Sequence, residues 1–192
     1  CMMNKVEGKP AMIPSDVSGQ GEKRVKLPDP VTVEQAREIL KKVREAKRPV
    51  INAGNGIRIG KAFDVFARVV KKLGIPVVTG WNSIDGMYDT DPLYVGRAGH
   101  MGDRAGNFAV QNSDLLLSLG SRLSIRQVGY NYPTWAREAY VIYNDIDAEE
   151  LKKPTVHVDM PVHADVKDLL EKLELVLDEE EFDPNGGAKD KE

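Results

Sequence analysis

The chain has 192 residues, with 27 Lys and Arg against 30 Asp and Glu, which gives a formal net charge of −3. Proteins that grip nucleic acid or an anionic membrane need a basic surplus, so we expect neither partner. No apolar stretch approaches the roughly 18 residues of a membrane-spanning helix. We therefore expect a soluble protein, and because the chain holds one cysteine we expect it in the reducing cytoplasm.

A single cysteine, Cys1, excludes an internal disulfide and a cysteine-rich zinc site. A mature bacterial lipoprotein also begins with cysteine, but a start within a longer sequence explains Cys1 more simply. We expect neither a disulfide framework nor a structural metal to hold the fold together.

Glycine and proline recur through residues 1–30, where few apolar positions are periodic. This composition is typical of an extended connector. An acidic run followed by Asn185-Gly186-Gly187 indicates a second linker over residues 179–192. We expect the packed domain to cover residues 31–178.

Apolar residues at helical spacing predict four helices. Thr32 and Gln35 have the spacing of a capping box at the start of the first helix. Asp165 stands where an N-cap would begin the last helix. The four patterns run from 33 to about 47, from 62 to 73, through Asp103 and Ala109, and from 166 to 176.

Five short apolar runs between these helices predict strands. They cover residues 49–53, 75–79, 115–119, 139–143 and, as a shorter candidate, 155–158. The runs are too continuous for half-exposed antiparallel strands and are typical of buried parallel ones. Strands that alternate with helices predict an α/β fold, a doubly wound parallel sheet covered on both faces, in three layers.

Ligands of such a fold bind beyond the carboxyl ends of the strands, where the strand order reverses. Gly54-Asn55-Gly56 follows the first strand, and its free amides would meet a phosphate, unless it only forms a tight turn with positive φ. Gly99-His100-Met101-Gly102 would let the backbone approach a flat ligand. His100 would be a pH-sensitive donor or a solvated loop residue.

Charged side chains follow two later strands. Arg122 and Arg126 come after residues 115–119 and could clamp a diphosphate or form surface ion pairs. Asp145, with Asp147 two residues on, follows residues 139–143. A carboxylate there could accept a hydrogen bond from a ribose hydroxyl, cap the next helix, or do both.

Several common catalytic motifs do not occur in the sequence. It contains no G-x-S-x-G, no G-x-x-x-x-G-K-[ST] and no H-E-x-x-H. The motifs that hydrolases, P-loop proteins and zinc proteases use for their chemistry are therefore missing from the sequence. His157 and His163 have no further ligands at metal spacing, and we expect no metal site. We expect Trp81 and Trp135 to be packing residues.

A series of segments resembles, in order and spacing, the central domain of thiamine-diphosphate-dependent enzymes, and in particular acetolactate synthase large subunits. The resemblance extends from about residue 34 to residue 174. It implies a Rossmann-like domain with a six-stranded parallel sheet. The segments are 48–56, 73–79, 91–96, 99–102, 107–117, 120–123 and 145–147.

The resemblance also implies a larger enzyme. Residues 7–17 resemble the end of a preceding pyrimidine-binding domain, and residues 179–192 would lead to a pyrophosphate-binding domain. In the family these two domains bind thiamine diphosphate and Mg²⁺ and carry the catalytic Glu and the G-D-G motif. We therefore expect no catalytic residue and no metal ligand in this chain, which alone should be inactive. The complete enzyme would be an oligomer and a transferase or lyase. It would act as a carboligase or decarboxylase on a 2-oxo acid such as pyruvate.

The family's central domain holds FAD in acetolactate synthases, ADP in some relatives and no cofactor in others. The resemblance thus implies a scaffold that could bind FAD or ADP. In this sequence the family's usual G-M-H-G is Gly99-His100-Met101-Gly102, and its D-D-R is Ser124-Ile125-Arg126. The contacts would fall on Gly54, Asn55, Gly56, Gly99, His100, Met101, Gly102, Arg122, Arg126, Asp145 and Asp165.

Two other classes of protein share this type of sheet. One is a stand-alone nucleotide-binding accessory subunit, against which the linkers at both ends argue. The other is a sirtuin-like deacylase, which normally carries a four-cysteine zinc module that one cysteine cannot supply.

Overall fold

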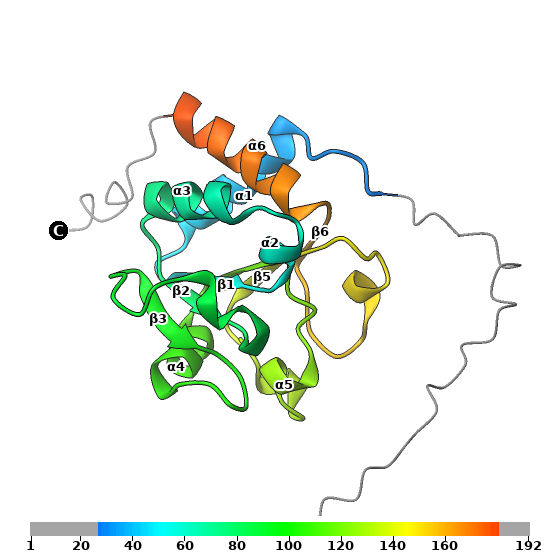
Figure 1. The fold of residues 1–192 in the computed structure, drawn as a ribbon. Coiled ribbons are helices and arrows are strands. Elements are labelled where there is room, and N and C mark those ends of the chain that lie inside the picture. Colours follow the sequence, from blue (N-terminus) through cyan, green and yellow to red (C-terminus); the bar gives the residue numbers. More distant parts are fainter. Residues whose placement is uncertain (1–26, 181–192) are drawn as a thin grey trace, which may run out of the picture.

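A computed structural model describes residues 27–180 of the chain (Figure 1). Most of the predicted first linker, including Cys1 and the segment that resembles the end of another domain, lies outside the described residues. So does most of the second linker, which begins at residue 179 in the prediction.

The core of the fold is an open sheet of six strands, all parallel, in the order β3-β2-β1-β4-β5-β6. This confirms the predicted α/β doubly wound fold. From β1 the chain moves outward to β2 and β3, and it then returns to β4 on the other side of β1. The strand order therefore reverses between β1 and β4. The strands are β1 (Pro49–Ala53), β2 (Val77–Thr79), β3 (Tyr94–Arg97), β4 (Leu115–Leu119), β5 (Tyr140–Asp145) and β6 (Met160–His163).

Helices cover both faces of the sheet and give the expected three layers. Figure 1 shows α1 (Val33–Glu45), α3 (Phe63–Leu73) and α6 (Val166–Glu179) together on one face, and α4 (Arg104–Asn112) and α5 (Ile125–Val128) on the other. Successive strand residues serve the two cores in turn: Ile51 packs under the three-helix layer, and Val50 packs under α4 and α5. The short elements are α2 (Gly56–Ile59), η2 (Trp81–Gly86), η3 (Tyr132–Thr134) and η4 (Glu150–Lys152).

Both predicted helix caps are confirmed. The Gln35 amide donates to Thr32 Oγ1 at 3.2 Å, and the Thr32 amide donates to Gln35 Oε1 at 3.0 Å, which completes a capping box. Asp165 Oδ1 accepts from the Lys167 amide at 2.7 Å at the start of α6. Within residues 27–180, none of these helices is long and apolar enough to cross a membrane.

The two edge strands differ from the prediction. The strand expected at residues 155–158 is wrong, because pairing with β5 begins only at Met160. Just before it, the Asp159 carboxylate accepts from the Val141 amide at 2.7 Å. An edge strand tolerates Pro161, which a central strand would not. Strand β3 was missed because its four residues are all only half-buried and therefore form no continuous apolar run.

Ion pairs tie α6 to the neighbouring helix α3. Arg68 donates to both oxygens of Glu174, at 2.7 and 2.9 Å, and Lys72 donates to the same carboxylate at 3.1 Å. These donors lower the pKa of Glu174 to about 2. The Glu174 side chain is only 17% exposed, so this pairing is shielded from water better than the other surface ion pairs of α6.

Candidate functional site

A cavity of about 710 Å³ opens where the strand order reverses. Its walls are the segments that follow β1, β2, β4 and β5, together with the first residues of α6. This volume lies within the range of about 300–1,000 Å³ typical of small-molecule sites. Seven of the predicted site residues line it: Gly54, Asn55, Gly56, Arg122, Arg126, Asp145 and Asp165.

The glycines of the first loop bring the ends of β1 and β4 into contact. The Gly54 amide donates to the Leu119 carbonyl at 2.9 Å, and the Gly56 amide donates to the Gly120 carbonyl at 2.8 Å. A Cβ on Gly56 would lie 2.7 Å from the Gly120 Cα. Of these three glycines only Gly120 has a positive φ, of 56°. The alternative of a tight turn with positive φ at Gly54 and Gly56 is therefore wrong.

These hydrogen bonds limit which groups of the first loop, residues 54–56, can bind a ligand. The amides of Gly54 and Gly56 are occupied by the carbonyls of Leu119, the last residue of β4, and of Gly120, the residue after it, so they are not free for a phosphate. The helix that starts at Gly56 has only four residues and offers little dipole. Among the described residues, the Asn55 side chain makes no hydrogen bond, and it faces the cavity. Positive charge for an anion must come from elsewhere in the wall.

Arg122 and Arg126 supply that charge. The Arg122 side chain is 69% exposed, and its nearest carboxylates, of Glu150 and Asp147, lie 3.6 and 3.9 Å away. Within the described part of the chain, the Arg126 guanidinium has no carboxylate partner. Exposed pairs at such distances are weak. Both guanidinium groups are therefore available to a phosphate or carboxylate, to which arginine binds through two parallel hydrogen bonds.

Asp145, at the end of β5, also lines the cavity. Asp145 is 5% exposed, and its Oδ1 accepts from the Asp147 amide at 2.9 Å. Burial raises its pKa. Asp147 in turn accepts from the Glu149 amide at 3.0 Å. The short helix η4 that follows has Glu149 as its N-cap and no side-chain cap, so neither carboxylate caps it. Asp165, at the N-cap of α6, also lines the cavity.

Asn144 is a site residue that the sequence analysis missed. Its amide donates to the carbonyls of Val162 and Ala164 at 3.1 and 2.9 Å. Its Oδ1 is the one buried side-chain polar atom without a partner among residues 27–180. Asn144 also lines the cavity. A buried acceptor without a partner is costly unless a ligand or water supplies a donor. Its position just before Asp145, at the end of a strand, is the feature of the sequence that could have identified it as a site residue.

A second cavity of about 450 Å³ adjoins the first. His100 and Met101 line it, whereas Trp81, Ala98 and Arg126 line both cavities. Trp81 is 50% exposed, so the expectation that it packs in the core is wrong. The same expectation for Trp135 is confirmed, since Trp135 is 4% exposed.

Gly99 and Gly102 line neither cavity and instead shape the loop that carries His100. Gly99 has φ of 113°, and a Cβ on Gly102 would lie 2.5 Å from the Arg97 carbonyl oxygen. Asp103 fixes the base of this loop by accepting from the Arg97 amide at 2.9 Å and from its guanidinium at 2.9 and 3.1 Å. These donors lower the pKa of Asp103 to about 2. Within residues 27–180, no group of three or more potential ligands could hold a metal ion.

An open parallel sheet whose strand order reverses beside a cavity defines the class of doubly wound, Rossmann-like α/β domains. Residues 36–173 match the family model of the central domain of thiamine pyrophosphate enzymes. The chain therefore belongs to this family, as the resemblance implied.

Curated relatives support the same assignment. The chain is 38% identical over 142 residues to an acetolactate synthase large subunit of Lactococcus lactis, and 34% identical over 153 residues to a probable acetolactate synthase large subunit of Methanococcus aeolicus. It is 36% identical over 143 residues to an acetolactate synthase of Mycobacterium avium. These matches cover 74–78% of this chain but only 23–25% of the relatives, so the chain spans about a quarter of their length.

Proposed function

We propose that this domain binds a nucleoside diphosphate, either FAD or ADP, in the cavity at the switch point. The observation that carries the proposal is the pair of arginines, Arg122 and Arg126, on one wall, neither held by a close carboxylate in the described residues. Asp145, at the end of β5, lines the same cavity, and its carboxylate can accept a hydrogen bond from a ribose hydroxyl.

The two adjoining cavities bear on the choice between FAD and ADP. Both ligands contain adenosine diphosphate, but FAD has a further flat ring system. Trp81, Ala98 and Arg126 form a common wall through which one ligand can extend from the first cavity into the second. His100 and Met101 would then contact only the part that FAD has and ADP lacks.

We further propose that the domain acts within a larger thiamine-diphosphate-dependent enzyme, as the names of its relatives suggest. There it would orient two flanking domains that bind thiamine diphosphate and Mg²⁺. The enzyme would be a homo-oligomeric carboligase or decarboxylase of a 2-oxo acid. A stand-alone nucleotide-binding subunit is the competing function, and a search of the reading frame on both sides of the chain for a catalytic Glu and a G-D-G motif decides between them.

Calorimetric titration of the full chain with ADP and with FAD tests the binding proposal. We expect saturable binding, weakened about tenfold by R122A or R126A, which is the loss expected when a charged hydrogen-bond partner is removed. R104A is the matched control, because Arg104 lies on α4 and stacks on Phe108 away from both cavities. M101A should weaken FAD alone. Absence of binding, or an equal loss in R104A, would overturn the proposal.

A further inference from the structure

We propose that Lys153 is a positioning residue that fixes the backbone of residues 122 and 123 and so holds the Arg122 guanidinium at the mouth of the cavity. The inference rests on the proposed binding of a nucleoside diphosphate. Lys153 itself does not line the cavity, and its part would be to place a residue that does.

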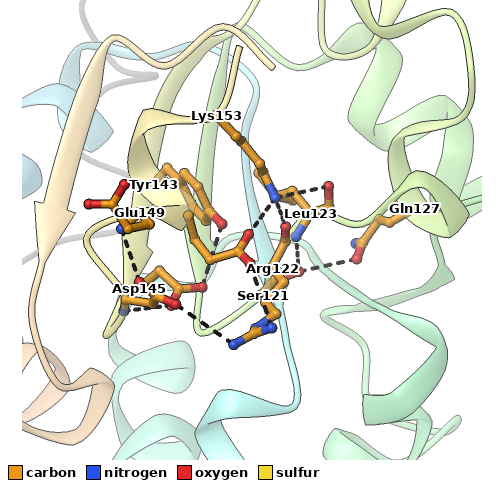
Figure 2. A network of polar contacts seen from close by, with 10 residues as sticks. Ser121, Arg122, Leu123, Gln127, Tyr143, Asp145, Glu149 and Lys153 are labelled. Carbon is orange, nitrogen blue, oxygen red and sulfur yellow. Dashed lines mark hydrogen bonds and ion pairs between the residues drawn. The ribbon is translucent and has the colours of Figure 1, made fainter. Parts of the chain in front are cut away.

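Two contacts connect Lys153 to this loop, and a third pairs it with Glu150. Its ammonium group donates to the Arg122 carbonyl oxygen, lies 3.5 Å from the Leu123 carbonyl oxygen, and donates to Glu150 Oε2 at 2.8 Å. Figure 2 shows Lys153 reaching down from the segment after β5 to the turn after β4. The Lys153 side chain is 22% exposed, so these bonds are partly shielded from water.

The loop needs such a restraint because of its backbone conformation. Leu123 has φ of 45°, in the left-handed region that residues other than glycine rarely adopt. A residue stays there only when its surroundings hold it. The Leu123 side chain is 2% exposed, and its amide makes only a long bond of 3.4 Å to Ser121 Oγ. The ammonium of Lys153 on the two carbonyls is the polar contact that holds the turn from the other side.

Few other contacts hold the Arg122 side chain in place. Its guanidinium is mostly exposed and meets Glu150 and Asp147 only at 3.6 and 3.9 Å. Lys153 also lies closer to Glu150, at 2.8 Å, than Arg122 does. The ammonium thus neutralises the carboxylate that would otherwise draw Arg122 away from an anion in the cavity. Both effects favour an arginine that is placed in advance for its ligand.

The neighbouring Lys152 provides a matched control. Its side chain is 68% exposed and, within residues 27–180, contacts only Glu149, in an ion pair at 2.8 Å. A methionine at position 153 or 152 keeps an unbranched side chain and removes the charge. K153M and K152M therefore differ in whether the loop after β4 loses its restraint.

Two measurements on the full chain test the inference. The first is the dissociation constant of ADP, measured for the wild type, K153M, K152M, R122A and the double variant K153M/R122A. We expect about tenfold weaker binding in K153M, a loss corresponding to one charge-assisted hydrogen bond. K152M should bind as the wild type does. The double variant should bind no more weakly than R122A, because Lys153 acts through Arg122.

The second measurement is hydrogen exchange of the amides of residues 121–124 without ligand. We expect faster exchange in K153M than in K152M or the wild type. Unchanged exchange together with unchanged affinity in K153M would overturn the inference, as would additive losses in the double variant. If the wild type binds no ADP, the proposed function fails, and hydrogen exchange alone then supports or overturns the part given to Lys153.

Discussion

Replacing Gly54 with alanine should force the ends of β1 and β4 apart. A Cβ at this position would lie 2.5 Å from the Ser121 Cα, and closer still to the Gly120 carbonyl oxygen. Both obstacles are backbone, which cannot rotate out of the way as a flexible side chain could. The added methyl group therefore has to be accommodated by moving one strand end.

The cost can be set against known core substitutions. Overpacking a well-packed interior by a methylene typically costs about 1–3 kcal/mol. Gly54 belongs at the upper end, because its amide also donates to the Leu119 carbonyl at 2.9 Å and a shift would weaken that bond. We expect G54A to lower the free energy of unfolding by about 3 kcal/mol, a large part of the total for a domain of this size.

Urea unfolding of the full chain, followed by circular dichroism, measures this loss. Gly86→Ala is the control, since its Cβ would meet only the Thr79 methyl group at 3.8 Å, an ordinary contact. We expect G86A to unfold within about 0.5 kcal/mol of the wild type, as surface changes usually do. If G54A were as stable as G86A, close approach of the two strand ends would not be the reason for glycine at this position.

Two further substitutions test contacts that stabilise the fold, one between α3 and α6 and one at the end of β5. E174Q should lower the free energy of unfolding by about 1–2 kcal/mol at pH 7. The pKa of Glu174 is about 2 in the folded state. The stability that Glu174 contributes is therefore present above its ordinary pKa of 4.5 and is lost as the pH falls toward 2. In urea titrations at decreasing pH, the free energies of unfolding of the wild type and E174Q should become equal. A difference that stays constant with pH would argue against the ion pairs. N144L removes the side-chain amide that donates to the buried carbonyls of Val162 and Ala164 and should cost about 2–3 kcal/mol by calorimetry, whereas N82L, at an exposed position, should not; equal melting temperatures would refute this role of Asn144.

The buried strands were predictable from the sequence because helices cover both of their faces. Strands β1 and β4 consist of residues that are nearly all buried, and such strands appear as continuous apolar runs. The edge strands β3 and β6 contact the sheet on one side only. Their sequences therefore tolerate Gly96 and Pro161, which interrupt the continuous apolar run that predicts a buried strand. The three layers followed from the alternation of strands and helices, which limits the topology strongly.

The candidate site was predictable in outline for a related reason. Parallel strands all end at one edge of the sheet, so Gly54, Arg122 and Asp145 had to lie near one another. What could not be predicted was the role of each residue. The Gly54 amide is occupied by a β4 carbonyl, a contact that depends on strand order. Lys153 reaches the Arg122 carbonyl from 31 residues away, across a turn whose shape the sequence does not reveal.

Nuclear magnetic resonance of the ¹⁵N-labelled chain during titration with ADP tests the central claim most directly, because it locates the ligand. We expect the largest shift changes at the ends of β1, β4 and β5, at Asn55, Arg122 and Asp145, with little change on α1, α3 and α6 beyond the first residues of α6, which line the cavity. Shifts confined to that helical layer, or none at ADP concentrations of about 1 mM, where even weak binding of roughly 4 kcal/mol is detected, would contradict a nucleotide site at the switch point.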